Sequence, residues 1–430
     1  MVIITGHVLY FVADPFNGTP QDAAKIIQDG AVCVHEGKIH DFGPRAEIIT
    51  RFPTTPVQDY RDHLIMAGFV DAHVHYPQTA MIASWGKRLI DWLNTYTFPE
   101  ESKFIDAAYA DTIANRYLDL ALAHGTTTVA SFCTIHPESV DAIFTAASAR
   151  NMCVVAGKTC MDRNAPDTLR DTAQAAYDQS KALLEKWHGQ GRNRYAITPR
   201  FSPTSTPEQL RALGALWAEH PDVLMQTHLS EQVDEIEWVK GLFPQARDYL
   251  DTYEAFGLLG ANGLYGHAIH LEPREIDRLR DVDAAVVHCP TSNTFIGSGL
   301  FDARGVIGHG IRTGLATDTG GGSSFSMLHT MAAAYEIGQL RGTALHAAEL
   351  LWMGTCGSAK ALRLDGEIGN IAKGHTADIV AINLASTPAI SQRHTKAFDI
   401  WDAVFATIMM GDDRAIAQVW VAGDPYKDAI

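Results

Sequence analysis

The middle of the chain alternates short apolar runs with amphipathic segments. Eight apolar runs of strand length lie between about residues 63 and 363, at 65–75, 126–131, 153–159, 195–201, 223–228, 263–267, 284–288 and 314–318. The segments between them carry apolar residues at helical spacing, as in 106–124, 137–150, 167–188, 207–220 and 273–280. Strands that alternate with helices are typical of βα units and a parallel sheet.

Eight such units over some 300 residues predict an α/β protein built as a (β/α)8 TIM barrel. A doubly wound sheet is the alternative layout. That fold usually carries a glycine-rich phosphate loop after its first strand, and the sequence after residue 75 has none. The pattern therefore favours the barrel.

Both ends of the chain have a different pattern, in which short strands are separated by turn residues. The predicted strands are 6–12, 31–35 and 38–42 at one end, and 378–382 and 417–421 at the other. The first group reads as a small antiparallel sheet. We therefore expect β-rich ends at 1–62 and 364–430 around a barrel domain at 63–363.

Composition narrows the functional classes. With 430 residues, 46% of them hydrophobic, the chain is a folded protein too long for one core. Its net charge of −16 disfavours binding to nucleic acid or to an anionic membrane, so a small or neutral substrate is expected. No apolar run reaches membrane-spanning length, and the first residues do not resemble a signal peptide.

The six cysteines are scattered, and no two form a C-x-x-C pair. This spacing argues against both a disulfide scaffold and a thiolate zinc site. It suits a reducing compartment, so we expect a cytoplasmic protein.

Metal-binding side chains stand at the ends of several predicted strands, where a barrel carries its chemistry. His73 and His75 are two residues apart, so both point to the same side of the first strand. Other strands end in His228, His267 and Asp318. Nitrogen and oxygen ligands of this kind suit Zn²⁺, with Fe²⁺ and Mn²⁺ as alternatives. Spacing alone does not separate His267 from His270 as the histidine of the sixth strand.

A metal so held lowers the pKa of bound water to roughly 7, which predicts a hydrolase. Hydrolysis needs groups that accept and donate protons, and the carboxylates Asp318 and Glu231 are the candidates. Glu231 lies three residues after His228, at the predicted start of a helix. An ordinary acidic residue in the first turn of that helix is the alternative interpretation.

An H-x-H first strand, single histidines on the fifth and sixth strands and an aspartate on the eighth resemble the amidohydrolase superfamily. Residues 369–380 (Gly-Asn-Ile-Ala-Lys-Gly-His-Thr-Ala-Asp-Ile-Val) are similar to the strand with which that family returns from the barrel. The resemblance covers nearly the whole chain. It implies that both chain ends fold into one small β-sandwich domain.

Longer motifs resemble the guanine deaminase family within this superfamily. They include residues 73–79 (His-Val-His-Tyr-Pro-Gln-Thr) and 91–101 (Asp-Trp-Leu-Asn-Thr-Tyr-Thr-Phe-Pro-Glu-Glu), together with 157–166, 199–203, 227–231, 288–293 and 314–320. The resemblance implies zinc-dependent hydrolysis of guanine at C2 to xanthine and ammonia. It also implies a homodimer.

The same resemblance implies roles for individual residues. His73, His75, His228 and Asp318 would bind one zinc ion, and His267 would contact the catalytic water. Glu231 would pass a proton to the purine ring, and Asp318 would move the water proton toward the departing ammonia. Gln78, Arg200 and Phe201 would hold the base, since an Arg fork can bind its carbonyl and an aromatic ring can cover its face.

Three alternatives stay open at this point. A related ring, such as 8-oxoguanine or a pterin, would use the same chemistry. A cyclic amide hydrolase would use two metals bridged by a carboxylated Lys158, although Arg200 on the fourth strand is not a metal ligand. A homologue that kept the barrel and lost its activity is the third, against which the intact set of ligands argues.

Overall fold

The computed structural model describes residues 1–86 and 88–426. The chain forms two compact units. One comprises residues 1–71, 119–128 and 325–430, and the other comprises 72–118 and 129–324. The division into 1–62 with 364–430 and 63–363 stays a prediction, and residues 427–430 of it lie outside the described part of the chain.

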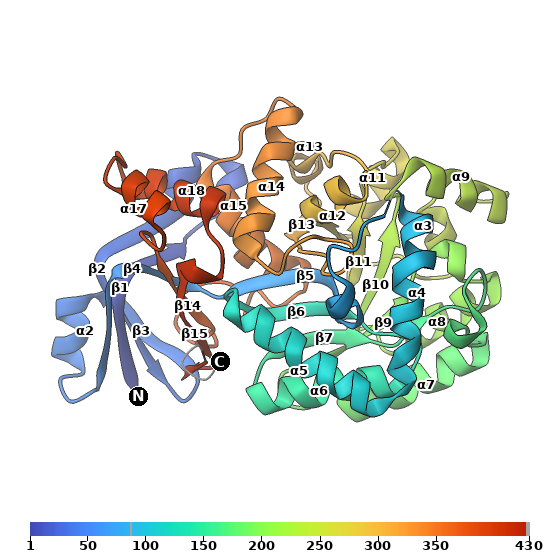
Figure 1. The fold of residues 1–430 in the computed structure, drawn as a ribbon, viewed down its shortest axis with the longest axis horizontal. Coiled ribbons are helices and arrows are strands. Elements are labelled where there is room, and N and C mark those ends of the chain that lie inside the picture. The colour runs from blue at the N-terminus through green and yellow to red at the C-terminus, as the bar shows by residue number, and fades with distance from the viewer. Residues whose placement is uncertain (87, 427–430) are drawn as a thin grey trace. The chain divides into compact units, whose positions relative to one another are not determined.

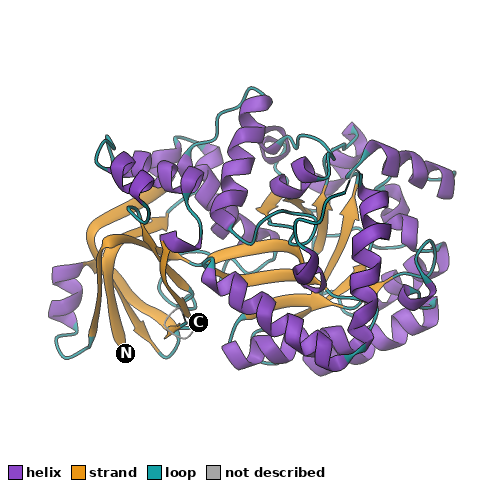
Figure 2. Ribbon diagram, viewed as in Figure 1, coloured by secondary structure: helices purple, strands orange, loops and turns teal. Residues whose placement is uncertain are grey.

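Eight parallel strands form a nearly closed barrel (Figures 1 and 2). They are β5 (Phe69–His75), β6 (Thr126–Phe132), β7 (Cys153–Gly157), β9 (Asn193–Pro199), β10 (Leu224–Leu229), β11 (Gly263–His267), β12 (Ala285–His288) and β13 (Arg312–Leu315), with the short β8 (Thr159–Cys160) paired to β9. Their sheet order is their chain order. Beyond β13, the Asp318 N–H donates to the His73 carbonyl at 3.0 Å, which brings the last strand back to the first. The predicted TIM barrel is confirmed.

Helices lie outside these strands, and Figure 1 shows α6 (Pro137–Arg150), α7 (Ala173–Trp187) and α8 (Pro207–Glu219) around β7 and β9. Local signals fix their ends. Thr206 caps α8 by accepting from the Gln209 N–H, and α6 ends at Asn151 in the left-handed conformation. Further helices of this unit and its boundary are α3 (Leu89–Trp92), α4 (Phe98–Glu101), α5 (Ala107–Ala123), α9 (Val233–Leu242), α10 (Asp251–Glu254), α11 (Pro273–Asp281), α12 (Pro290–Phe295) and α13 (Ala303–Gly308).

The first predicted strand, 65–75, proved to be two. β4 (Val57–Ala67) ends and β5 begins on either side of Gly68, whose position leaves no room for a side chain beside Thr127. Because every residue from 64 to 75 is buried, hydrophobicity alone could not mark this break. The prediction that Asp318 belongs to the last strand was also wrong, since β13 ends at Leu315.

Both chain ends build one seven-stranded sheet, as expected. It contains β1 (Val2–Phe11), β2 (Ala24–His35), β3 (Lys38–Pro44), β4, β14 (Ile379–Asn383), β15 (Ile416–Val421) and β16 (Asp424–Pro425), in the order β16-β15-β14-β4-β1-β2-β3. The antiparallel sheet predicted for the first group of strands is confirmed, since β1 pairs antiparallel with β2 and β2 with β3. β4, which lay outside that prediction, runs parallel to β1. The sheet is therefore mixed.

The C-terminal stretch also contains two helices that the strand-rich prediction missed, α17 (Pro388–His394) and α18 (Ile400–Met410). α18 is largely apolar, which hides its helical spacing. The other helices of this unit are α1 (Pro20–Ala23), α2 (Arg45–Arg51), α14 (Met327–Leu340), α15 (Ala347–Trp352) and α16 (Ser358–Ala361). Across residues 1–86 and 88–426, no helix is long and apolar enough to cross a membrane.

Candidate active site

Four predicted ligands come together at the carboxyl ends of the barrel strands. The Nε2 atoms of His75 and His228 are 3.1 Å apart. Asp318 Oδ1 lies 3.6 Å from His73 Nε2 and 3.8 Å from His75 Nε2. All four side chains are buried. The ends of β5 and β10 and the turn after β13 thus supply a single cluster.

The surroundings of the cluster favour binding of a metal cation over protonation of the histidines. Burial, followed by the neighbouring histidines and Arg200, holds the pKa of His73 and His75 well below the usual value, so these imidazoles are neutral and can act as ligands. His228 Nδ1 donates to the Arg200 carbonyl at 2.7 Å, which leaves Nε2 free for a metal. His73 Nε2 is buried and has no hydrogen-bond partner among the described residues. These donors fit a metal ion.

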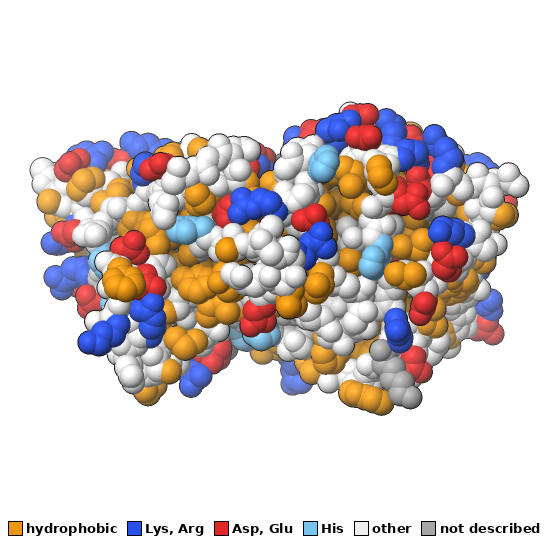
Figure 3. All heavy atoms as spheres, turned by 90° about the horizontal axis from the view of Figure 1, so that it is seen from above, with side chains coloured by type: hydrophobic (Ala, Val, Ile, Leu, Met, Phe, Trp, Pro, Cys, Tyr) orange, Lys and Arg blue, Asp and Glu red, His pale blue; other side chains and the backbone are white. Residues whose placement is uncertain are grey.

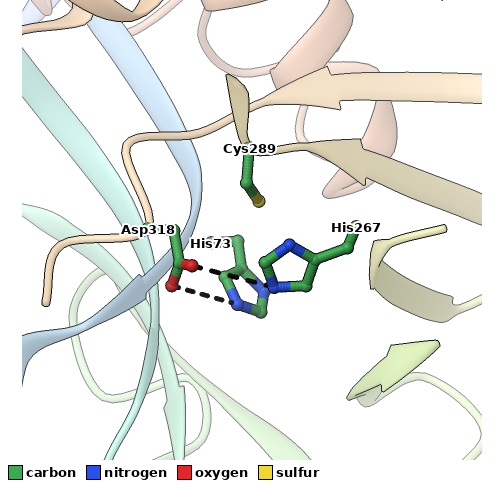
Figure 4. A group of neighbouring side chains, drawn as sticks. All are labelled: His73, His267, Cys289 and Asp318. Carbon is green, nitrogen blue, oxygen red and sulfur yellow. Dashed lines mark ion pairs between the residues drawn. The ribbon is translucent and has the colours of Figure 1, made fainter. Parts of the chain in front are cut away.

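His267 lies beside His73, and Figure 4 shows that the two carboxylate oxygens of Asp318 each face one of these rings. Its Nε2 is 3.7 Å from Asp318 Oδ2 and 3.6 Å from Glu231 Oε2, while Nδ1 pairs with Asn293 Oδ1 at 2.9 Å. Burial lowers the pKa of His267, but Glu231 and Asp318 outweigh it and raise that pKa. The structure thus places His267 in the cluster, whereas His270 bonds to the Ser298 carbonyl.

Glu231 is not an exposed acid in a first helical turn. It precedes α9, which begins at Val233, and it is 3% exposed. Its Oε1 accepts from the Ser298 hydroxyl at 2.8 Å, so its other oxygen faces His267. The alternative interpretation of Glu231 as an ordinary helix-start acid is therefore wrong.

Backbone conformation at the strand ends is unusual. Ser230, His267 and Asp318 have φ values of 48°, 66° and 49°, in the left-handed region that residues other than glycine rarely adopt. Such residues persist where the surrounding structure holds them, and they concentrate at functional sites. All three lie just at or beyond the ends of β10, β11 and β13.

A cavity lies beside the cluster, and its wall combines apolar side chains with a few polar groups, as is typical of small-molecule sites. Gln78, Arg200 and Phe201 line it together with His75, His228, His267, Glu231 and Asp318. Leu89, Trp92, Leu93 and Ile296 form an apolar part of the wall. The structure therefore brings all nine residues predicted for the site to one place, since His73, the ninth, lies 3.6 Å from Asp318.

Comparison with known proteins agrees with this arrangement. Residues 64–425 match the amidohydrolase family. The chain belongs to the amidohydrolase family. It is 44% identical to guanine deaminase of Escherichia coli over 93% of this chain and 92% of that protein, and 32% identical to the human guanine deaminase over 88% and 87%.

Solved structures of amidohydrolases share the fold over its full length. The E. coli guanine deaminase superposes with a TM-score of 0.97 at 42% identity, covering 99% of both chains. The guanine deaminase of C. acetobutylicum, solved with guanine bound in its active site, has a TM-score of 0.89 at 29% identity and covers 98% of this chain and 99% of its own.

Sequence reasoning missed several residues of this amidohydrolase site, among them Cys289 and Glu101. Cys289 follows β12 and turns its sulfur toward His73, His267 and Asp318, with which it shares a potential metal-binding group (Figure 4). The strand-end rule would have found it, because it directly follows His288. Glu101 contacts Gln78 and Arg200, and no spacing rule points to it.

Lys158 is turned away from this site. Its ammonium forms a buried ion pair with the Asp171 carboxylate, whose other oxygen accepts from Gln209 at 2.7 Å. Carboxylation requires a free amine, and this amine is already paired with the Asp171 carboxylate. The arrangement disfavours the two-metal alternative in this amidohydrolase.

Proposed function

We propose that this protein is a zinc-dependent guanine deaminase that converts guanine and water to xanthine and ammonia. One observation carries the proposal, namely that the metal-ligand cluster and the polar residues suited to a purine line the same cavity. The names of the relatives, one of them solved with guanine bound, agree with it.

The donors favour one zinc ion held by His73, His75, His228 and Asp318. Three neutral imidazoles and a carboxylate match the ligand preferences of Zn²⁺, while Fe²⁺ and Mn²⁺ accept the same atoms. Bound zinc would supply a water molecule acidified to near neutral pH. The ion pair of Lys158 argues for one ion per chain.

The proton-transfer roles fall to the buried acids around His267. Burial raises the pKa of Asp318 to about 6, with His267 acting in the opposite direction. A carboxylate beside His267 and the proposed metal would be placed to accept a proton from the attacking water. We assign it the water proton. Glu231, held by Ser298, would deliver a proton to the purine ring, and His267 would orient the attacking water.

The base would lie against Phe201, with its carbonyl at Arg200 and its ring N–H at Gln78. Arg200 offers only donors, and an amide offers both a donor and an acceptor. The substrate is neutral, and the face of the molecule in Figure 3 has basic and acidic side chains interspersed rather than gathered in one basic field. A small purine suits this surface better than a nucleic acid does.

A substrate screen combined with metal analysis tests the proposal. Purified protein would be assayed for ammonia release from guanine, 8-oxoguanine, adenine, cytosine and a pterin, with xanthine identified by absorbance and metal by elemental analysis. We expect guanine as the preferred substrate and about one zinc per chain. Ammonia from another ring only would refute the substrate assignment, and two metals per chain would refute the mononuclear site.

We further propose that the enzyme is a cytoplasmic homodimer, as the resemblance to its family implies. The scattered cysteines agree with a reducing compartment, since all six lie in the described part of the chain, are buried and form no disulfide. Light scattering of the purified protein tests the dimer, and a monomeric mass at working concentration would refute it. Fractionation of cells tests the compartment.

A further inference from the structure

Glu101 is a fully buried carboxylate that lies between Gln78 and Arg200, the two polar residues at the end of the cavity where the base would bind. It ends α4 and is 0% exposed. Its Oε1 accepts from Gln78 Nε2 at 2.8 Å, and its Oε2 accepts from Arg200 Nη1 at 2.6 Å. Both carboxylate oxygens are therefore occupied by residues that line the cavity, which Glu101 itself does not line.

This contact determines which way the Gln78 amide faces. A carboxylate has no hydrogen to donate, so the NH₂ of Gln78 must point to Glu101 and its oxygen must point away. That oxygen is buried and makes no hydrogen bond to any residue in the described ranges. Because Gln78 lines the cavity, the unpartnered oxygen is the acceptor that a ligand N–H would satisfy.

Gly320 keeps the space for this oxygen. It has a φ of 112°, and a side-chain carbon built there would collide with Gln78 Oε1. The oxygen is thus set between the Glu101 contact on one side of the amide and a glycine on the other. Its orientation follows from these two neighbours rather than from Gln78 itself.

An acceptor beside a donor matches one edge of guanine. The N1–H and the C6 carbonyl of guanine are adjacent, so Gln78 Oε1 would accept from the first and Arg200 would donate to the second. A ring without a hydrogen on N1, such as 2-aminopurine, would place the lone pair of N1 against Gln78 Oε1, so that two acceptors would face each other. Sites built to bind a hydrogen-bonding group reject ligands that lack it.

We infer that Glu101 is a positioning residue that sets the hydrogen-bond polarity of the base-binding end of the cavity, that is, which side-chain atoms there accept hydrogen bonds and which donate them. Glu101 thereby selects purines with a protonated N1. The inference rests on the proposed function for its substrate. It concerns the orientation of Gln78 and the pairing of Arg200, and Glu101 itself need not contact the base.

The Glu101→Gln variant tests this polarity. Arg200 can only donate, so the new amide must turn its oxygen to Arg200 and its NH₂ to Gln78. Gln78 then turns its oxygen to position 101 and its NH₂ to the cavity. We expect the ratio of kcat/KM for guanine to that for 2-aminopurine to fall at least about tenfold, because an N–H donor would then face the N1–H of guanine.

Exchanging the side chains of Gln78 and Glu101 should restore the hydrogen-bond acceptor that faces the cavity. In the double variant Gln78→Glu, Glu101→Gln, the carboxylate at position 78 again presents an acceptor to the cavity, and one carboxylate still neutralises Arg200. We expect it to recover at least about fivefold of the lost ratio. A merely structural role for Glu101 predicts equal losses for both substrates and no recovery, and that result would overturn the inference.

Glu100→Gln is the matched control. It changes the neighbouring carboxylate on the same helix, whose partners are Lys103 Nζ at 2.6 Å and the Tyr109 hydroxyl. We expect its substrate ratio to equal that of the wild type. Thermal melting and zinc content of each variant separate misfolding from a change in polarity.

Binding without turnover keeps the test independent of the proposed function. Hypoxanthine carries the N1–H and carbonyl of guanine but no 2-amino group, and unsubstituted purine carries neither. Calorimetry should show that wild type prefers hypoxanthine and that Glu101→Gln loses this preference. Absence of ammonia from guanine in the wild type would refute only the proposed function, whereas equal binding of both ligands, or binding of neither, would overturn the inference.

Discussion

Two sets of residues in this protein are almost equally buried but contribute differently, one to stability and the other to the candidate active site. In the seven-stranded sheet, Val32, Ile65 and Trp420 are 0% exposed and belong to one apolar core. At the barrel mouth, His73 and Glu231 are nearly as buried, 1% and 3%, but they are polar. Burial of a polar group without a hydrogen-bond partner, such as His73 Nε2, costs about 1–3 kcal/mol, so this group lowers stability whereas the apolar core raises it. Buried apolar residues therefore stabilise the sheet, whereas buried polar residues at the barrel mouth are available for chemistry.

Removal of a proposed metal ligand should have the largest effect on activity. His228→Ala should reduce zinc from about one per chain to near none and lower kcat/KM at least about 10³-fold, because activation of water is lost. Elemental analysis and ammonia release measure the two effects. His394→Ala, at an exposed position of α17, is the control and should change neither. Full metal content in His228→Ala would contradict the assignment.

Removing a proton-transfer group should separate chemistry from metal binding. Glu231→Gln keeps the size of the side chain but not its acidity, so zinc should stay while kcat falls at least about 10²-fold. The same substitution at Glu237, which is exposed on α9, serves as the control. Unchanged kcat in Glu231→Gln would refute its proposed role.

A substitution that creates a cavity in the core of the seven-stranded sheet should lower stability and leave catalysis unchanged. Ile379 is 0% exposed on β14, so Ile379→Ala should lower the free energy of unfolding by about 2–5 kcal/mol, and Ile379→Val by about 0.5–1.5 kcal/mol. Denaturant unfolding measures the loss. The kcat/KM of the folded fraction should not change, and a parallel loss of kcat would show that the two regions are not separable.

The smallest expected effect concerns the residue that orients Glu231. Ser298→Ala removes the hydroxyl that donates to Glu231 Oε1 and should lower kcat about two- to tenfold, the worth of one hydrogen bond. KM for guanine and zinc content should stay near the wild-type values. A large rise in KM with unchanged kcat would instead indicate that Ser298 acts in binding.

Much of the site followed from strand ends. The two-residue repeat of a strand placed His73 and His75 on one side, and the barrel rule added His228, His267 and the Asp318 region. The break at Gly68 was missed because the residues around it are uniformly apolar. The position of Glu231 before α9, rather than in it, depends on where the helix begins, and helix ends are the least certain part of a sequence pattern.

The barrel and the candidate metal ligands could therefore be predicted from local patterns, since short-range periodicity decides which side chains reach the end of each strand. Contacts between residues far apart in the chain became known from the folded structure. Glu101 contacts Arg200 over 99 residues, and Ser298 contacts Glu231 over 67. A buried carboxylate or hydroxyl can pair with many side chains, so residue type and spacing leave its partner open until the chain has folded. The orientation of Gln78, and with it the hydrogen-bond polarity of the cavity, is decided at that stage.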